Sequence, residues 1–238
     1  MKALKVTILA SALIAGFTAA QAQQNADEIF AKHYNAIGGD NWNNVKSMKS
    51  TGTADAQGMS IEMTNTTLNN KANRQDITMM GTSGYTIVTN TEGWSFMPMM
   101  GQTEPEALKD EDIKGSQEKL DIKSQNNVDI KANAAKSEIV GKEKIGDMEC
   151  IKVKVTDKDN NEQTMYFDPN SYYLVCLKAK TEMQGQSVDM IYNFSDFKKL
   201  DAGIVVPMKI DMGPQGSLTF TNIEVNKPID ESIFKPSK

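Results

Sequence analysis

Histidine and arginine are almost absent from this chain of 238 residues, in which His33 and Arg74 are the single examples. Acid–base and nucleophilic catalysis commonly depend on a histidine, and no G-x-S-x-G or H-E-x-x-H motif is present. His33 falls near the apolar face of a predicted helix, which is typical of a packed structural histidine. The sequence therefore predicts a non-enzymatic protein without a cofactor or a metal centre.

Clustered positive charge is also missing. The formal net charge is −5 at pH 7, whereas nucleic-acid binding needs Lys and Arg gathered on one surface. We therefore expect no nucleic-acid partner.

Long apolar runs are absent beyond the N-terminus. Residues 1–22 have a basic start, an apolar stretch from Val6 to Ala20 that is too short to span a bilayer comfortably, and a final Ala20-Gln21-Ala22. These are the parts of a cleaved secretory signal peptide. The sequence predicts a periplasmic protein with a single mature domain over residues 23–238.

Cysteine is scarce, with only Cys150 and Cys176. A disulfide is the default expectation in an oxidising compartment. However, both cysteines fall on the Lys-bearing faces of two predicted strands that have a third strand between them. A bridge needs Cα atoms within about 7 Å, whereas next-nearest strands lie about 9.5 Å apart. The sequence therefore does not decide between a disulfide and two free thiols.

One amphipathic helix opens the predicted mature chain. Asn25 and Glu28 form a plausible capping pair. Gly38 and Gly39 end the helix. Its apolar face carries Ile29, Phe30, His33, Tyr34 and Ile37.

From Val45 onward the apolar residues recur with a period of two, which indicates antiparallel strands with one wet face. The clearest segments are 59–64, 85–90, 151–156, 187–194 and 206–212. The apolar face of such a sheet must be covered by closure, by a second sheet or by helices. Because helices are few, we expect a mainly β (α+β) fold, an antiparallel unclosed half-barrel whose concave face is covered by the N-terminal helix and a helical insertion.

That insertion occupies residues 103–134. Thr103, Pro105 and Glu106 resemble a helix start. Its large apolar residues up to Ser124 are few, and Gly115 interrupts the pattern; they are Leu108, Ile113, Leu120 and Ile122. A solvated surface helix or loop is favoured over a movable flap.

Methionine, in contrast, is abundant, with 15 residues in the chain. Most fall on the apolar phase of predicted strands, and "WSFMPMMG" (94–101) concentrates them beside Trp94 and Phe96. Methionine is flexible and adapts to partners of variable shape, so the face is either an irregular filled core or a soft lining. Thioether binding of Cu(I) by Met97, Met99, Met100 and the Met79-Met80 pair is a weaker alternative.

Three segments carry a resemblance to a known family: "YTIVTNTEGWSFMP" (85–98), the hairpin run 163–197, and "FTNIEVNKPIDESIFKP" (220–236). Together they resemble the LolA/LolB-like carrier family of bacterial envelopes. The resemblance implies an unclosed antiparallel barrel around an apolar cavity lidded by helices. It also implies a carrier or sensor whose partners are an acyl chain or lipoprotein lipid moiety and an envelope membrane complex.

The resemblance places the strand and loop that carry Trp94, Phe96, Met97, Met99 and Met100 near the cavity mouth. Arg74 matches an arginine that the family carries on an early strand. Met63 and Met79 are among the methionines of the predicted strands. The predicted ligand-binding set is Trp94, Phe96, Met97, Met99, Met100, Arg74, Met63 and Met79. A structural or protein-interaction role with a filled core is the alternative in a different class.

Overall fold

The computed structural model describes residues 26–56, 58–158, 160–183 and 186–237. Contacts divide the chain into two compact units. Unit 1 contains the described residues up to Ala36 together with Ile130–Ile191, and unit 2 contains Ile37–Asp129 and Tyr192–Lys238. The predicted signal peptide and Asn25 lie outside the described residues.

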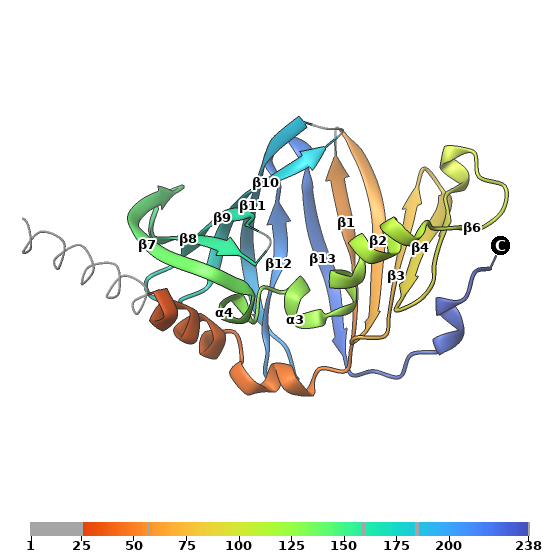
Figure 1. Cartoon of the computed structure of the whole chain (residues 1–238). Coiled ribbons are helices and arrows are strands. Elements are labelled where there is room, and N and C mark those ends of the chain that lie inside the picture. Colours follow the sequence, from red (N-terminus) through yellow and green to blue (C-terminus); the bar gives the residue numbers. More distant parts are fainter. Residues whose placement is uncertain (1–25, 57, 159, 184–185, 238) are drawn as a thin grey trace, which may run out of the picture. The chain divides into compact units, whose positions relative to one another are not determined.

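The strands form one antiparallel 13-stranded sheet in the linear order β6-β5-β4-β3-β2-β1-β13-β12-β11-β10-β9-β8-β7 (Figure 1). Since β6 and β7 are the two ends of this order, the sheet is not closed. The predicted mainly β, unclosed antiparallel fold class is confirmed. In the part of the chain that the structure describes, no helix combines the length and hydropathy needed to cross a membrane.

Unit 1 contains the helix over residues 26–36, the short helix α4 (Ile130–Asn133), and four complete strands. These strands are β7 (Ala134–Ile145), β8 (Met148–Asp157), β9 (Glu162–Phe167) and β10 (Leu174–Met183), followed by the first part of β11 (Gln186–Lys199). The helix packs through Phe30 and His33, whose rings lie 6.1 and 5.3 Å from that of Phe167. His33 is 3% exposed and its Nδ1 lies 2.9 Å from the Tyr172 carbonyl oxygen. The predicted helix and packed histidine are confirmed.

The two cysteines lie on the face of unit 1 that carries the lysines. Cys176 pairs in register with Tyr166 of β9, and Tyr166 pairs with Lys152 of β8. Strand β9 therefore separates the two thiols, as the pattern predicted, and both cysteines are free and buried. Burial raises the pKa of Cys150, and it raises the pKa of Cys176 to about 11.

Unit 2 begins with the turn of helix η1 (Gly39–Asn44) and continues as a meander of strands. These are β1 (Ser47–Ala56), β2 (Met59–Leu68), β3 (Ala72–Met79), β4 (Thr82–Thr89) and β5 (Gly93–Phe96). After η2 (Pro98–Met100) comes the two-residue strand β6 (Glu106–Ala107). The rest of β11, then β12 (Val205–Asp211), η4 (Gly213–Gln215), β13 (Ser217–Val225) and η5 (Glu231–Phe234) complete the unit.

The insertion contains α2 (Asp110–Gly115), η3 (Gln117–Leu120) and α3 (Ile122–Gln125). The predicted helix start at 103–106 is wrong, because Glu106 and Ala107 pair with β5 and take up its free edge. The insertion also differs from the solvated surface segment that its sequence favours, because part of it is buried against the sheet. Ile113 and Leu120 pack on Val88 with Leu108 beside them, and Ile122 is 1% exposed.

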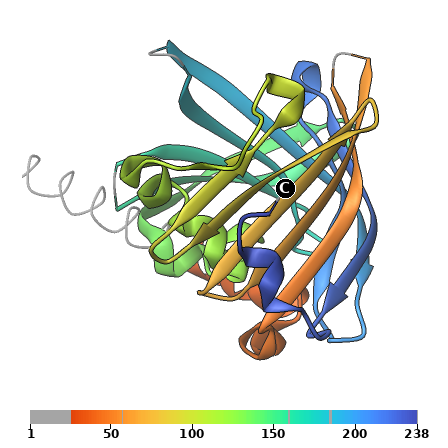
Figure 2. The same cartoon turned by 90° about the vertical axis from the view of Figure 1, so that its right-hand side faces the viewer.

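The strands of unit 2 consequently have two distinct sides. We call the side of Val88, on which the insertion packs, the insertion face. The opposite side carries Tyr85 and Ile87, which pack against Phe234 of η5. We call it the terminal face; Figure 2 shows the C-terminal segment, in dark blue, crossing the strands there.

Candidate ligand-binding face

Two rows of apolar side chains cross the insertion face, and the strand register defines both. The first apolar row runs through Met79, Ile61, Ala54, Leu218, Ile210 and Phe194. The second apolar row runs through Gly84, Ile77, Met63, Gly52 and Phe220. Cross-strand neighbours on one face pack side by side, so the rows form a continuous apolar surface.

The large side chains of both rows are half-buried. Val88, which lies farther along β4 on the same face, is instead only 1% exposed because the insertion covers it. The insertion therefore closes one end of the face and leaves the apolar rows accessible. A contiguous accessible apolar surface on a folded protein usually marks a binding site.

The insertion face of β1–β4, β12 and β13 bears none of the charged residues of these strands, which the structure describes in full. Register places all of them on the terminal face: Lys49, Asp55, Glu62, Arg74, Asp76, Lys209, Asp211 and Glu224. An ionised group pays a large desolvation cost beside hydrocarbon. The insertion face is therefore suited to an apolar guest.

A polar row lies between the apolar rows and the insertion. It contains Thr86, Gln75, Asn65 and Ser50, which are cross-strand neighbours and all half-buried. We call this row the amide belt. It offers neutral hydrogen-bonding groups next to the apolar surface.

The next row carries the buried side chains of Asn73 and Thr67. Asn73 Nδ2 donates to Asn65 Oδ1 at 2.8 Å and to Thr67 Oγ1 at 2.9 Å. Gln125 of α3 donates to Thr67 Oγ1 at 3.3 Å and accepts from Asn65 Nδ2 at 3.4 Å. These bonds attach the insertion to the sheet and fix the orientation of Asn65.

Two glycines let backbone approach this face closely. A Cβ on Gly52 would collide with the Thr219 carbonyl oxygen at the bulge between β1 and β13. A Cβ on Gly84 would lie 2.9 Å from Met97 Sδ. The Met97 thioether therefore lies over Gly84, beside the second apolar row.

The structure does not bring the predicted ligand-binding residues together. Met63, Met79 and Met97 lie on the insertion face. Trp94 and Phe96 pair with Ile87 and Tyr85, which places them on the terminal face. There they pack in the cluster around Phe234, and Trp94 Nε1 is buried without a hydrogen-bond partner among the described residues.

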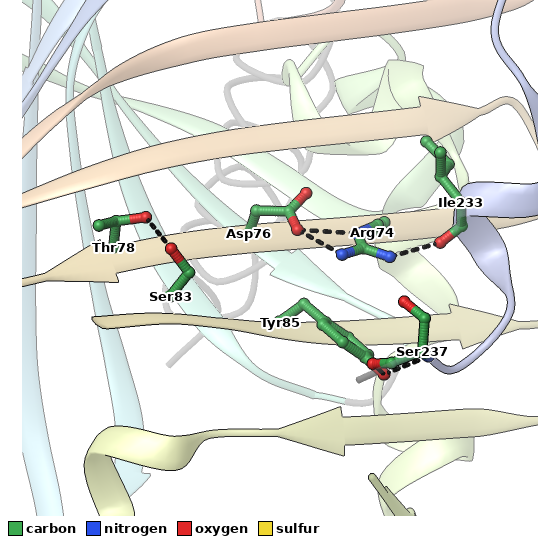
Figure 3. A network of polar contacts seen from close by, with 7 residues as sticks. All are labelled: Arg74, Asp76, Thr78, Ser83, Tyr85, Ile233 and Ser237. Carbon is green, nitrogen blue, oxygen red and sulfur yellow. Dashed lines mark hydrogen bonds and ion pairs between the residues drawn. The ribbon is translucent and has the colours of Figure 1, made fainter. Parts of the chain in front are cut away.

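Arg74 is also on the terminal face, and its hydrogen bonds are internal (Figure 3). The guanidinium donates to Asp76 Oδ1 at 2.7 and 2.8 Å and to the Ile233 carbonyl oxygen at 2.7 Å, and it lies 4.2 Å from the Tyr85 ring centroid. The Tyr85 hydroxyl donates to the Ser237 carbonyl at 2.7 Å and accepts from its N–H at 2.8 Å. Arg74 and Tyr85 thus hold the C-terminal segment on the sheet.

The remaining two predicted residues lie in η2. Met99 is half-buried, whereas Met100 is 81% exposed. Reasoning from the sequence missed Ile61, Ile77 and Phe220, although their alternation along each strand was visible. Their membership of one surface depends on strand pairing, which no local pattern specifies.

A charged cluster on unit 1 was also not anticipated. Glu143 accepts hydrogen bonds from Lys152 at 2.7 Å and Lys178 at 3.0 Å, and the Tyr166 hydroxyl lies 3.3 Å away. The two hydrogen bonds from the lysines lower the pKa of Glu143 to about 2. The charged cluster has a structural explanation, since Lys178 Nζ lies 4.7 Å from the ring centroid of Tyr166, which is buried with Cys150 and Cys176.

No protein-family model matches the chain, and no curated protein matches it in sequence. Solved structures do match. A DUF1329 family protein from Desulfovibrio piger has 13% identity and a TM-score of 0.52, with 88% of this chain and 97% of that chain covered. An outer membrane lipoprotein-sorting protein domain from Vibrio parahaemolyticus has 12% identity and a TM-score of 0.53, with 89% and 97% covered. A LolA superfamily protein from Nitrosomonas europaea has 13% identity and a TM-score of 0.53, with 88% of this chain and 97% of that chain covered. The chain therefore has a LolA-like fold, which is what the resemblance of its sequence implied.

Proposed function

We propose, from the premise of a LolA-like fold, that this protein is a periplasmic, non-enzymatic carrier or sensor. Its ligand is an acyl chain of a lipoprotein or another envelope lipid. The acyl chain of this ligand binds on the insertion face of unit 2, over the two apolar rows. The observation that carries the proposal is the half-buried apolar surface from which the charged residues of β1–β4, β12 and β13 are segregated.

The energetics favour such a ligand. Each methylene removed from water contributes about 0.8 kcal/mol, so even a short stretch of chain over the rows contributes several kcal/mol. Met63, Met79 and Met97 can change rotamer at little cost and so accept chains of different length. In this proposal Trp94, Phe96 and Arg74 maintain the terminal face rather than line the site.

The coarse basis for assigning a lipid is the fold shared with a lipoprotein-sorting domain and a LolA superfamily protein. The chemistry of the face independently points to an apolar guest. A periplasmic location rests on the N-terminal pattern of residues 1–22. In this proposal, a donor or acceptor membrane complex would contact the protein at the position where the lipid enters the insertion face.

A matched pair of adjacent methionines tests the proposal. Met79 is half-buried in the first apolar row, whereas Met80 is 90% exposed in the following turn. Titration with a fluorescent acyl methyl ester should saturate with the wild-type protein. Met79→Glu should weaken binding at least tenfold, because a carboxylate would contact the hydrocarbon, and Met80→Glu should not change it. Absence of saturable binding by the wild type would refute the proposal.

A further inference from the structure

The insertion face changes character along its strands. From the β3–β4 hairpin inward, the first and second apolar rows come first, the amide belt follows, and the row covered by the insertion comes last. A ligand lying over both apolar rows and extending toward the insertion must therefore meet the amide belt.

Part of the amide belt has unused hydrogen-bonding capacity. Asn65 is bonded to Asn73 and Gln125. The side chains of Gln75, Thr86 and Ser50 have no hydrogen-bond partner among the described residues, yet each is half-buried. Gln75 lies between Asn65 and Thr86 in the register, at the centre of the belt.

These unpaired groups would lower the affinity of the face for a pure hydrocarbon that covered them. Covering a donor or acceptor without replacing its hydrogen bond to water costs about tenfold or more in affinity for each group. A ligand that brings its own hydrogen-bonding group to this depth avoids the cost. The belt contains amide and hydroxyl groups but no cation, so it offsets only part of the desolvation cost of an ionised ligand group.

We propose that the amide belt recognises an uncharged hydrogen-bonding group, such as the ester or amide carbonyl of an acylated lipid, whose hydrocarbon lies over the apolar rows. This inference rests on the proposed function and narrows its ligand class. The site would select acyl esters and amides over alkanes and over ionised fatty acids. The Gln75 side-chain amide would donate to the carbonyl, and Thr86 and Ser50 would complete the polar contact.

The test compares competitors of equal carbon number: a methyl ester, an N-methyl amide, an alkane and a fatty-acid anion. Each displaces a fluorescent acyl methyl ester from the wild-type protein and from Gln75→Met, which preserves side-chain length and removes the amide. Wild type should prefer the ester and the amide to the alkane and the anion. Gln75→Met should reduce the ester-to-alkane preference about tenfold. Gln215→Met, an exposed position in η4, is the matched control and should leave the preference unchanged.

Thr86→Val provides a second variant that removes a hydroxyl with little change of volume, in case Gln75→Met does not fold. It should reduce the same preference in the same direction. If the probe binds saturably but neither folded variant changes the ester-to-alkane preference, the inference is overturned and the proposed function stands. If the wild type binds none of the compounds, both fail.

Discussion

Replacing Arg74 by Met separates a structural arginine from a ligand-binding one. The substitution keeps most of the aliphatic length and removes the guanidinium. That group bonds to Asp76 and to the Ile233 carbonyl and stacks on Tyr85. If the assignment to the terminal face is correct, Arg74→Met destabilises the protein and leaves the affinity for acyl probes unchanged.

The magnitude follows from these contacts. A hydrogen bond from a charged donor contributes about 1.5–3 kcal/mol. The ion pair is discounted, because the Asp76 side chain is 39% exposed and can be rehydrated. The Arg74 side chain is only 15% exposed, so its bond to Ile233 should dominate. We expect a loss of about 2 kcal/mol in the free energy of unfolding, which lowers the urea midpoint by about 1 M.

Tryptophan fluorescence during urea unfolding is a suitable assay, because both tryptophans, Trp42 and Trp94, belong to unit 2. Lys49→Met is the control: it removes an exposed cation from the same face and should leave the midpoint nearly unchanged. The same samples are titrated with the fluorescent acyl ester. An unchanged midpoint combined with weakened binding would refute the reasoning and return Arg74 to the ligand site.

Two further predictions concern unit 1. The pKa of Glu143 is lowered to about 2 by its bonds to Lys152 and Lys178, so its contribution to stability is full above the unfolded-state pKa near 4.5 and is lost as pH falls toward 2. Glu143→Gln should therefore lower the urea midpoint, followed by circular dichroism, at pH 6 and change it much less at pH 2.5; an equal effect at both pH values would contradict the pairing. Cys150 and Cys176 should resist a thiol reagent in the native protein and both react after unfolding without reductant, whereas fewer than two reactive thiols would indicate a bridge.

The sequence was informative wherever a local period determines structure. The helix over residues 26–36 follows from one apolar stripe and a double glycine, both read within a few turns. Alternation and chain order alone place Cys150 and Cys176 two strands apart, as the structure has them. The helix start that the sequence predicts at 103–106 is wrong, because Glu106 and Ala107 pair with a sheet edge that no local signal reveals.

The candidate site shows the limit of such reasoning. Alternation predicts that Trp94 and Phe96 share one side of their strand. It also predicts that Met63 shares one side of its own strand with the residues two positions before and after it. It cannot state whether these two sets share a face of the sheet, because a pairing shift of one residue exchanges the faces. The observed register sets them apart and joins Met63 to Ile77 and Phe220 instead.

The amino-acid sequence by itself therefore determined the mainly antiparallel architecture, the N-terminal helix and the separation of polar from apolar side chains along each strand. These depend on periods of 3.6 and 2 that each segment carries within itself. Only the tertiary structure decided which side chains form the two apolar rows of the insertion face, where the insertion covers that face, and that Arg74 holds the C-terminal segment. Those features arise from pairings between residues far apart in the chain, and their geometry exists only once the strands have been brought into register.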